Sequence, residues 1–227
     1  AQTTGAIVVG ASLPLSGPNA AAGPAGPAVP NAHFASFNQA GGIEARSLRL
    51  TAPADAFNPQ KAAENARQLI DAKVVALVNC WGTSSCNAMV PIANQAGIAL
   101  VGGIAGGGTM RSEPGRYAFN IRASTVAEID IMVRHMVSIG QTSVAVMYQD
   151  DGFGKAGLAG VEAALARRQL QLVAAAGYER NTDRVDDAVK TIKASDAQAV
   201  ILVAINKPAA AFIRRYREQG GGAQLYN

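Results

Sequence analysis

The chain has 227 residues, a formal net charge of +4 from 20 basic and 16 acidic residues, and a hydrophobic fraction of 49% of which few residues are aromatic. This length accommodates one large domain or two small ones, and a composition rich in alanine and glycine is typical of helices packed closely on a sheet in an α/β protein. The mild and scattered positive charge gives no sign of a nucleic-acid partner, and no apolar run approaches the ~20 residues of a membrane span, so direct membrane insertion is not expected.

The first half of the chain predicts four strand–helix units. Residues 1–5 are short and polar, as in a mature exported chain whose signal peptide has been removed, although an engineered start would look the same. Proline and glycine are frequent between residues 19 and 30, so the first helix is expected to begin only at Pro27–Asn31. The expected strands are short apolar or alternating runs at residues 6–13, 47–51, 74–78 and 98–101.

Residues 117–125 separate this half from a second series of the same kind. Apolar Phe119 and Ile121 alternate there with Asn120 and Arg122, which predicts an extended and half-buried segment. The side chain of Arg122 could reach a ligand as a cation, or it could pair with an acid such as Asp130. We expect the segment to be a crossing between two α/β lobes.

The second half repeats the pattern of strands and helices. Residues 125–128 resemble a capping box, so either Ser124 or Thr125 is expected to start the first helix of this half. Asp150 and Asp151 could be a pair of catalytic acids, but a role in capping the following helix is the simpler interpretation. The expected strands cover residues 143–148, 170–176, 197–204 and 223–227, and the last of these is cut short by the end of the chain.

The two cysteines, Cys80 and Cys86, form a C-x5-C pair that does not match a zinc site, because only two histidines exist and neither is nearby in the sequence. The pair is either a disulfide or two buried thiols. A disulfide requires that the turn bring the two Cα atoms within ~7 Å, and an oxidising compartment would favour it.

Parallel sheets bind ligands beyond the carboxyl ends of their strands, so the loops after the predicted strands are the candidate sites. Residues 81–85 lead into a helix and are built from Trp81, Gly82, Thr83 and serines that include Ser84; their hydroxyls and amides could hold an anion at the positive end of the helix. The alternatives are that Thr83 or Ser84 only caps the helix, and that Trp81 fills the core instead of stacking on a ligand. A second glycine-rich loop with the same potential contains Ala105, Gly106 and Gly107.

Motifs that would indicate an enzyme are missing from the sequence. The glycines of residues 102–108 do not fit G-x-G-x-x-G, and no phosphate-binding G-x-x-x-x-G-K-[ST] occurs. Residues 82–86 lack the last glycine of a nucleophile elbow, and there is no HExxH zinc motif. We therefore expect no catalysis, cofactor or metal.

Several short segments, spread along the chain, carry a family resemblance. The order and spacing of these segments resemble the type I periplasmic substrate-binding proteins of ABC importers, specifically the branched-chain amino acid (Leu/Ile/Val-binding-like) family. The matching segments are Gly10–Pro18, Asn38–Ile43, Asp55 with Asn58–Pro59, Gly82–Thr83, Arg111 with Arg116–Arg122, and Tyr148–Lys155.

The resemblance implies two Rossmann-like lobes with parallel sheets flanked by helices, at residues 1–120 and 121–227, which close on a small ligand in the cleft between the lobes by a hinge motion. It implies that residues 79–85 and 102–107 hold a carboxylate, and that a membrane permease of an ABC importer is the partner of a periplasmic receptor. The predicted ligand contacts in the second lobe are Tyr148 and Phe153, and the predicted hinge residues are Asn120, Arg122 and Ser124. It also implies that the second lobe is incomplete and that the family's last third is missing from this chain.

Departures from the family pattern concern the ligand. Residues 20–22 are alanines and residues 204–207 lack an aromatic residue, whereas amino-acid binders often have aromatic contacts in these two loops. The ligand is therefore expected to be a branched-chain amino acid or a related amino or aromatic acid. The alternative functions are a cytosolic ligand sensor of the same fold that regulates a partner and, less favoured, a doubly wound enzyme.

Overall fold

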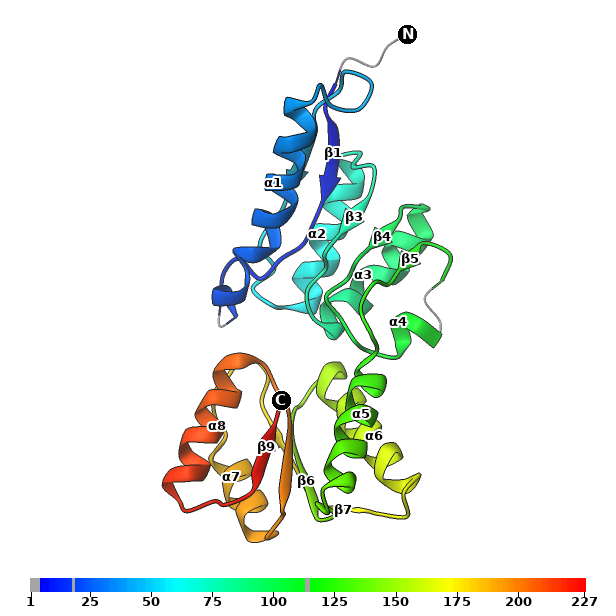
Figure 1. Cartoon of the computed structure of the whole chain (residues 1–227). Helices are drawn as coiled ribbons and strands as arrows, with labels where there is room; N and C mark the ends of the chain where they lie inside the picture. Colours follow the sequence, from blue (N-terminus) through cyan, green and yellow to red (C-terminus); the bar gives the residue numbers. More distant parts are fainter. Residues whose placement is uncertain (1–4, 18, 113–114) are drawn as a thin grey trace. The chain divides into compact units, whose positions relative to one another are not determined.

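The computed structural model describes residues 5–17, 19–112 and 115–227, and the chain divides into two compact α/β units. The first unit is Ala1–Ala105 with Thr109–Arg122, and the second is Gly106–Gly108 with Ala123–Asn227. Each unit consists of one parallel sheet with helices packed on it (Figure 1). Residues 1–4, on which the predicted start of a mature chain falls, lie outside the described residues.

The first unit contains a five-stranded parallel sheet in the order β2-β1-β3-β4-β5. The reversal of strand order beside β1 is that of a doubly wound fold, in which the crossover connections place helices on both faces. The strands are β1 (Ile7–Gly10), β2 (Leu48–Thr51), β3 (Leu77–Val78), β4 (Leu100–Val101) and β5 (Ala118–Phe119).

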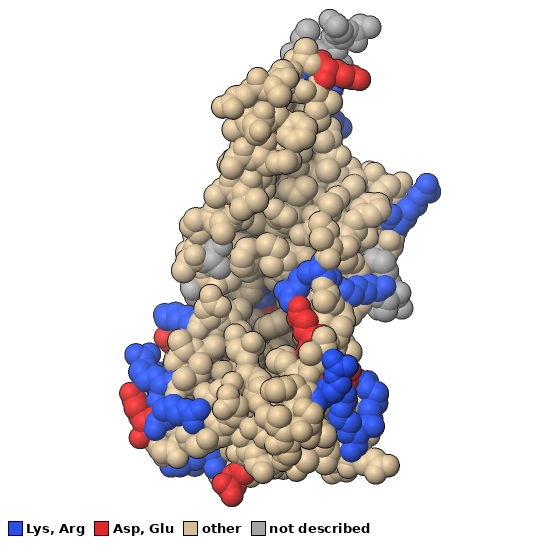
Figure 2. Space-filling view, viewed as in Figure 1, with Lys and Arg blue, Asp and Glu red and all other residues tan. Residues whose placement is uncertain are grey.

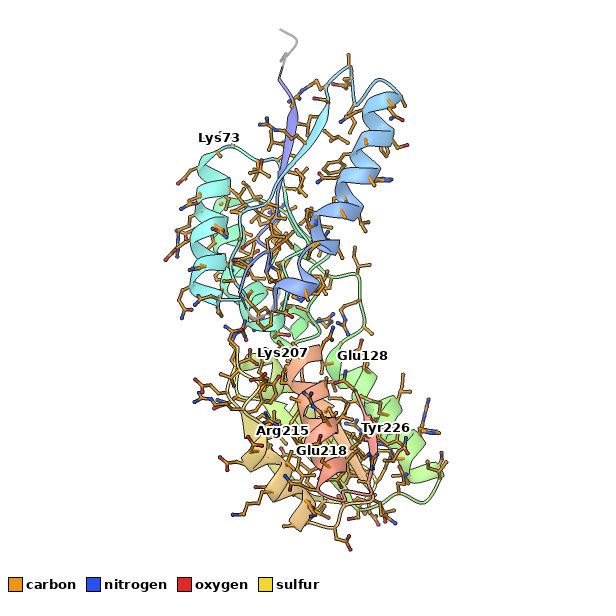
Figure 3. The ribbon with its side chains drawn as sticks, turned by 90° about the vertical axis from the view of Figure 1, so that its left-hand side faces the viewer. Lys73, Glu128, Lys207, Arg215, Glu218 and Tyr226 are labelled. Atoms are coloured by element: carbon orange, nitrogen blue, oxygen red, sulfur yellow. A yellow bond between two sulfur atoms is a disulfide. The ribbon has the colours of Figure 1, made fainter. Side chains whose placement is uncertain are left out.

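The helices of this unit differ in how much they bury. Two of them pack side by side on one face of the sheet and form its apolar core with residues such as Leu69, Leu77 and Met89. The first helix lies on the opposite face (Figures 1 and 3) and has only Gly26 buried. The bounds are η1 (Ala20–Ala22), α1 (Ala25–Gln39), α2 (Pro59–Asp71), α3 (Thr83–Ala96) and α4 (Thr109–Ser112).

The second unit has a four-stranded parallel sheet in the order β7-β6-β8-β9, with two helices on each face. Side chains alternate along β6, so that Ala145 and Met147 face one core whereas Val144 and Val146 face the other. The strands are β6 (Val144–Gln149), β7 (Leu172–Tyr178), β8 (Ala199–Val203) and β9 (Gln224–Tyr226). The helices are α5 (Thr125–Ser138) and α6 (Gly152–Ala166) on one face, and α7 (Asp186–Ala194) and α8 (Asn206–Glu218) on the other.

Charge is distributed unevenly over the two units. The sequence of α1 contains no charged residue, and the surface over this helix is almost free of blue and red atoms in Figure 2. The second unit carries both signs, and ion pairs join its helices: Lys207 and Arg215 of α8, which are labelled in Figure 3, bind Asp183 at 3.4 Å and Asp186 at 2.9 Å. Within the described ranges, no helix is long and apolar enough to cross a membrane.

Several predicted boundaries are wrong at the ends of elements. The third strand is confined to Leu77–Val78, whereas residues 74–78 were expected to form it. Val75 is 55% exposed, so this apolar run is not covered on both faces. Helix α1 begins at Ala25, before the prolines that were expected to delay it. Pro27 lies in the first turn, where backbone amides have no partner within the helix, and Pro30 lies inside the helix.

The crossing segment is extended, as predicted, because Ala118 and Phe119 form β5 beside β4. It is not half-buried throughout, since Ile121 is 79% exposed. The next helix is capped by Ser124, whose hydroxyl oxygen accepts a hydrogen bond from the amide of Ala127 at 3.1 Å. The capping residue is therefore Ser124 and not Thr125, and the serine satisfies one of the amides that the first turn leaves open.

Candidate ligand-binding site

The two loops singled out in the first unit lie side by side. They follow β3 and β4, which are neighbours in the parallel sheet, so both emerge at the same edge. Beyond the strands the pairing continues, because the amide of Ile104 donates to the carbonyl oxygen of Cys80 at 2.8 Å and the amide of Gly82 donates to that of Ile104 at 3.0 Å. The two loops are therefore joined by backbone hydrogen bonds between residues 80–82 and residue 104.

Helix α3 starts in the first of these loops without a side-chain cap. Its N-cap is Gly82, so the interpretation of Thr83 or Ser84 as a simple N-cap is wrong. Gly82 has φ +83° and ψ 140°, and a Cβ added there would lie 2.5 Å from Cε2 of Phe57. Only glycine meets both conditions, because a side chain would be strained by the backbone angle and would collide with the phenylalanine ring.

Two hydroxyl groups at the start of α3 are buried without a partner. Thr83 is 2% exposed and Ser85 is 0% exposed, and neither side-chain oxygen has a hydrogen-bond partner in the described part of the protein. A buried hydroxyl that makes no hydrogen bond costs about 1–3 kcal/mol of stability. The helix dipole adds positive potential at the same place, so this end of α3 suits an anionic ligand that accepts hydrogen bonds.

A disulfide joins Cys80, just before this loop, to Cys86 in the first turns of α3. The two Cα atoms are 5.3 Å apart, within the distance that a disulfide requires. Both sulfur atoms pack against Gly103 of the second loop, where an added Cβ would lie 2.9 Å from Sγ of Cys80. The disulfide thus links the two ends of the loop at residues 81–85 and packs against the second loop.

The second loop is held by Arg111 of α4. Its two terminal nitrogens each donate to the carbonyl oxygen of Ala105 at 3.3 Å, and Nη2 also donates to the carbonyl oxygen of Arg122 at 2.8 Å. One arginine therefore ties the glycine-rich loop to the crossing segment. The side chain of Asn120 donates to the carbonyl oxygen of Met110 at 2.6 Å and holds α4 in the same way.

Gly106 and Gly107 are buried and belong to the second unit, where the carbonyl oxygen of Gly106 accepts from the amide of Thr125 at 2.7 Å.

Asp130, named as a partner for Arg122, binds Arg167 at 2.7 Å and Arg168 at 2.9 Å instead. Those two guanidinium groups lower the pKa of the Asp130 carboxyl group. Asn120, Arg122 and Ser124 thus each have a structural contact, and their role as a hinge stays a prediction.

Trp81 is half-buried and its backbone pairs with Ile104. This tryptophan directly precedes Gly82, the N-cap of α3. Whether it stacks on a ligand or fills the core stays a prediction.

The strand ends of the second unit form a polar network around Asp151. One oxygen of Asp151 accepts hydrogen bonds from the amides of Phe153 at 3.0 Å and Gly154 at 3.1 Å, so the predicted capping role in the acid pair is confirmed. The other oxygen accepts from Nε2 of Gln149 at 2.7 Å and pairs with the guanidinium group of Arg180. The N-terminus of α6 is thereby joined to the ends of β6 and β7.

Tyr178 extends this network to the third strand end. Its hydroxyl donates to Oε1 of Gln149 at 3.1 Å and accepts from the amide of Ile205, which follows β8, at 3.4 Å. Burial of the ring raises the pKa of the Tyr178 hydroxyl far above its ordinary value, so the group stays a neutral donor. No motif in the sequence predicted the roles of Gln149, Tyr178 and Arg180. The one available signal was a glutamine at the end of an otherwise apolar strand.

Tyr148 and Phe153 are both half-buried and pack against the core beneath α5 and α6. The ring of Tyr148 covers Gly177, where an added Cβ would lie 3.3 Å from Cζ of the tyrosine. Their role as ligand contacts stays a prediction. Among the described residues, no cluster of three or more His, Cys, Asp or Glu side chains could hold a metal ion.

Comparison with known proteins agrees with this arrangement of strand-end loops in two α/β units. A family described as periplasmic binding protein matches residues 6–226. The chain belongs to the periplasmic binding protein family. The predicted fold of two α/β units with parallel sheets flanked by helices, and the resemblance to Leu/Ile/Val-binding-like proteins, are confirmed by this match and by the solved structures.

Solved members of the periplasmic binding protein family superimpose closely on this chain. A substrate-binding periplasmic protein from Ralstonia solanacearum is 39% identical with a TM-score of 0.91, covering 96% of this chain and 62% of its own. A possible leucine/isoleucine/valine-binding protein from Rhodopirellula baltica SH 1 is 28% identical with a TM-score of 0.92, covering 98% and 62%.

A curated relative is an amino acid binding protein from Pseudomonas aeruginosa, 26% identical over 219 residues, which are 94% of this chain and 58% of the relative. The chain thus spans about three fifths of the length of these periplasmic binding proteins.

Proposed function

We propose that this protein is an extracytoplasmic solute receptor of an ABC importer and that it binds a small ligand through a carboxylate group. The observation that carries the proposal is the buried hydroxyl of Thr83, which has no partner in the described part of the chain and lies at the positive end of α3. A carboxylate oxygen accepts hydrogen bonds from a hydroxyl and from helix-terminal amides, and its negative charge is favoured by the helix dipole.

The ligand class is inferred from the relatives and from the sizes of loop residues. One relative is described as an amino acid binding protein, and a solved structure as a possible leucine/isoleucine/valine-binding protein. The loop after β1 carries alanines at positions 20 and 21, in a region where amino-acid binders often have an aromatic ligand contact. These small side chains would leave room for a ligand with a larger side chain. We therefore propose amino acids and simple aromatic acids as the ligands.

A membrane permease and a periplasmic location are part of the same proposal. The disulfide between Cys80 and Cys86 supports it, because disulfides persist in oxidising compartments and are rare in the cytosol. The same observation weighs against a cytosolic ligand sensor of this fold.

Isothermal titration calorimetry tests the carboxylate directly. L-leucine, L-valine and benzoate are titrated into the protein, with L-leucinamide and benzyl alcohol as matched compounds that lack the carboxylate. We expect heat from at least one carboxylate and none from its matched compound. Equal binding of the carboxylate and its neutral counterpart would contradict the proposed anion site, and heat with none of the five would contradict the proposed ligand class.

Replacement of Thr83 by valine removes the hydroxyl and keeps the shape of the side chain. Loss of a hydrogen bond to a charged group costs about 1.5–3 kcal/mol, so the Kd of the bound carboxylate should rise about tenfold or more. The Tm should stay equal or rise, because the hydroxyl makes no hydrogen bond within residues 5–17, 19–112 and 115–227 that the variant would lose. Thr142→Val, at an exposed threonine of the second unit, is the control and should change neither value.

An unchanged Kd in Thr83→Val would exclude the Thr83 hydroxyl as a ligand contact. A lowered Tm together with weaker binding in Thr83→Val would mean that the threonine stabilises the fold and is not a ligand contact.

A further inference from the structure

A buried carboxylate lies in the loop after β2, outside the two loops of the candidate site. Asp55 is 0% exposed and its Oδ2 accepts a hydrogen bond from the hydroxyl of Ser12 at 2.8 Å. The same hydroxyl oxygen accepts from Nδ2 of Asn65 on α2 at 3.0 Å. The other carboxylate oxygen of Asp55 accepts from the amide of Phe57 at 2.8 Å. This cluster therefore connects β1, α2 and the loop after β2.

The backbone that Asp55 holds is strained. Ala56 and Phe57 follow it with φ +53° and +60°, a left-handed conformation that residues with a Cβ rarely adopt. Two further backbone hydrogen bonds close the turn. The amide of Asp55 donates to the carbonyl oxygen of Leu13, and the amide of Asn58 donates to the carbonyl oxygen of Asp55, both at 2.9 Å. Strained residues persist where the surroundings determine them, and they concentrate at functional sites.

The strained turn supports the candidate site from behind. Phe57 is 2% exposed, and its ring packs on the glycine that caps α3, since a Cβ added to Gly82 would lie 2.5 Å from Cε2. Gly82 sets the direction of the amides that follow it, because it holds the N-cap position with a positive φ. A shift of the Phe57 ring would therefore move the start of α3.

We propose that Asp55 is a positioning residue of the ligand site, which acts through Phe57 on Gly82 and so sets the conformation of residues 81–85. The proposal rests on the proposed function of the site, and it extends that function to a buried residue outside the two candidate loops. Asp55 provides the acceptor that keeps Phe57 in its left-handed conformation, and Ser12 with Asn65 keeps the carboxylate in place.

The first test needs no ligand, because Trp81 is the single tryptophan of the chain and lies directly before Gly82. In Asp55→Ala, the emission maximum of Trp81 should shift to longer wavelength and quenching by acrylamide should increase while far-ultraviolet circular dichroism is unchanged. Asp55→Asn keeps an acceptor for the amide of Phe57 and should retain the signal of the unchanged protein.

The matched control is Asn58→Ala in the same loop. Asn58 accepts hydrogen bonds from the amides of Gln60 at 2.9 Å and Lys61 at 3.1 Å, so its loss weakens α2 without releasing Phe57. The Tm of Asn58→Ala should fall while Trp81 emission and quenching stay the same. A folded Asp55→Ala variant with unchanged Trp81 emission and quenching would overturn the proposal.

Two milder variants decide the question if Asp55→Ala does not fold. Ser12→Ala loosens the carboxylate, and Phe57→Leu withdraws the ring from Gly82; both should change Trp81 quenching in the same direction. If neither changes it, Asp55 supports only the fold and the proposal is wrong.

The second test measures binding of L-leucine and benzoate by calorimetry. For whichever of the two binds to the unchanged protein, Asp55→Ala should weaken binding on the order of tenfold, as misplaced anchoring groups do, and Asn58→Ala should not. If neither compound binds, the proposed function fails for these ligands while the Trp81 measurement still decides the role of Asp55. A changed Trp81 signal with unchanged affinity would show that the loop moves without affecting the site, which also overturns the proposal.

Discussion

At the scale of single residues, buried polar side chains near the strand ends fix the conformation of the neighbouring loops. Asp55 in the first unit and Tyr178 in the second are each buried among hydrogen-bond partners that come from separate loops. Burial makes such bonds costly to lose, because the partner left behind cannot turn to water. These residues therefore set the shapes of the loops that follow the strands.

The pH dependence of stability should reveal the buried hydroxyl of Tyr178. Its pKa is raised in the folded protein, mainly by burial, whereas an unfolded tyrosine ionises near pH ~10. Above that pH the unfolded state loses the proton first, so this group's contribution to the free energy of unfolding is intact below pH ~10 and falls as the pH rises further. Urea unfolding at pH 8 to 11 should give a shallower alkaline decline for Tyr178→Phe than for the unchanged protein.

At pH 8 the same variant should be less stable by about 1–3 kcal/mol, because Oε1 of Gln149 and the amide of Ile205 lose their shared partner. Alkaline declines of equal slope in the two proteins would contradict a raised pKa in the fold.

At the scale of elements, the disulfide and the pairing with the neighbouring loop give the loop before α3 a defined conformation. The sequence separation of Cys80 and Cys86 is 6 residues, so the disulfide constrains the first turn of α3 together with the loop before it. The loop also pairs with Ile104 of its neighbour. Its amides are therefore held in place before a ligand arrives, which lowers the entropic cost of binding.

Reduction of this disulfide should cost about 2 kcal/mol of unfolding free energy, the value expected for closing so short a loop in the unfolded chain. Urea unfolding with and without dithiothreitol measures the loss. A variant carrying both Cys80→Ser and Cys86→Ser is the control, and its stability should not respond to the reductant. If dithiothreitol leaves the urea midpoint of the protein with both cysteines unaltered, the disulfide adds no stability.

At the scale of the whole molecule, the strands differ in burial according to their place in each sheet. In the second unit β8 is buried along its whole length between two helix layers, whereas in the first unit β2 is an edge strand that alternates between half-buried and exposed residues. Local opening costs least where few apolar contacts are broken. Stability should therefore vary strongly between these two strands.

Hydrogen exchange of backbone amides tests this difference in the intact chain. The amides of Val200–Leu202 in β8 should exchange by far the most slowly, and those of Leu48–Leu50 in β2 among the fastest of the strand amides, because β8 lies between β6 and β9. Equal protection in both strands would contradict the link between double-sided burial and local stability.

The order of elements was predictable from the sequence because apolar periodicity and turn residues are local signals. A continuous apolar run is typical of a strand covered on both faces, and the structure places helices on both faces of residues 199–203. The run at residues 74–78 looked the same, yet Val75 is exposed. Coverage by helices depends on how far a strand extends along its neighbours, and a local pattern carries no information about that.

The sequence by itself determined the fold class, the series of strand-end loops and the segment in which an anion could bind. Only the tertiary structure decided that Gly82 caps α3, that the hydroxyl of Thr83 has no hydrogen-bond partner among the described residues, and that the ring of Phe57, from another loop, packs on Gly82. The physical reason is that helix and strand propensities act over a few neighbouring residues, whereas these contacts join residues dozens of positions apart through packing and buried hydrogen bonds.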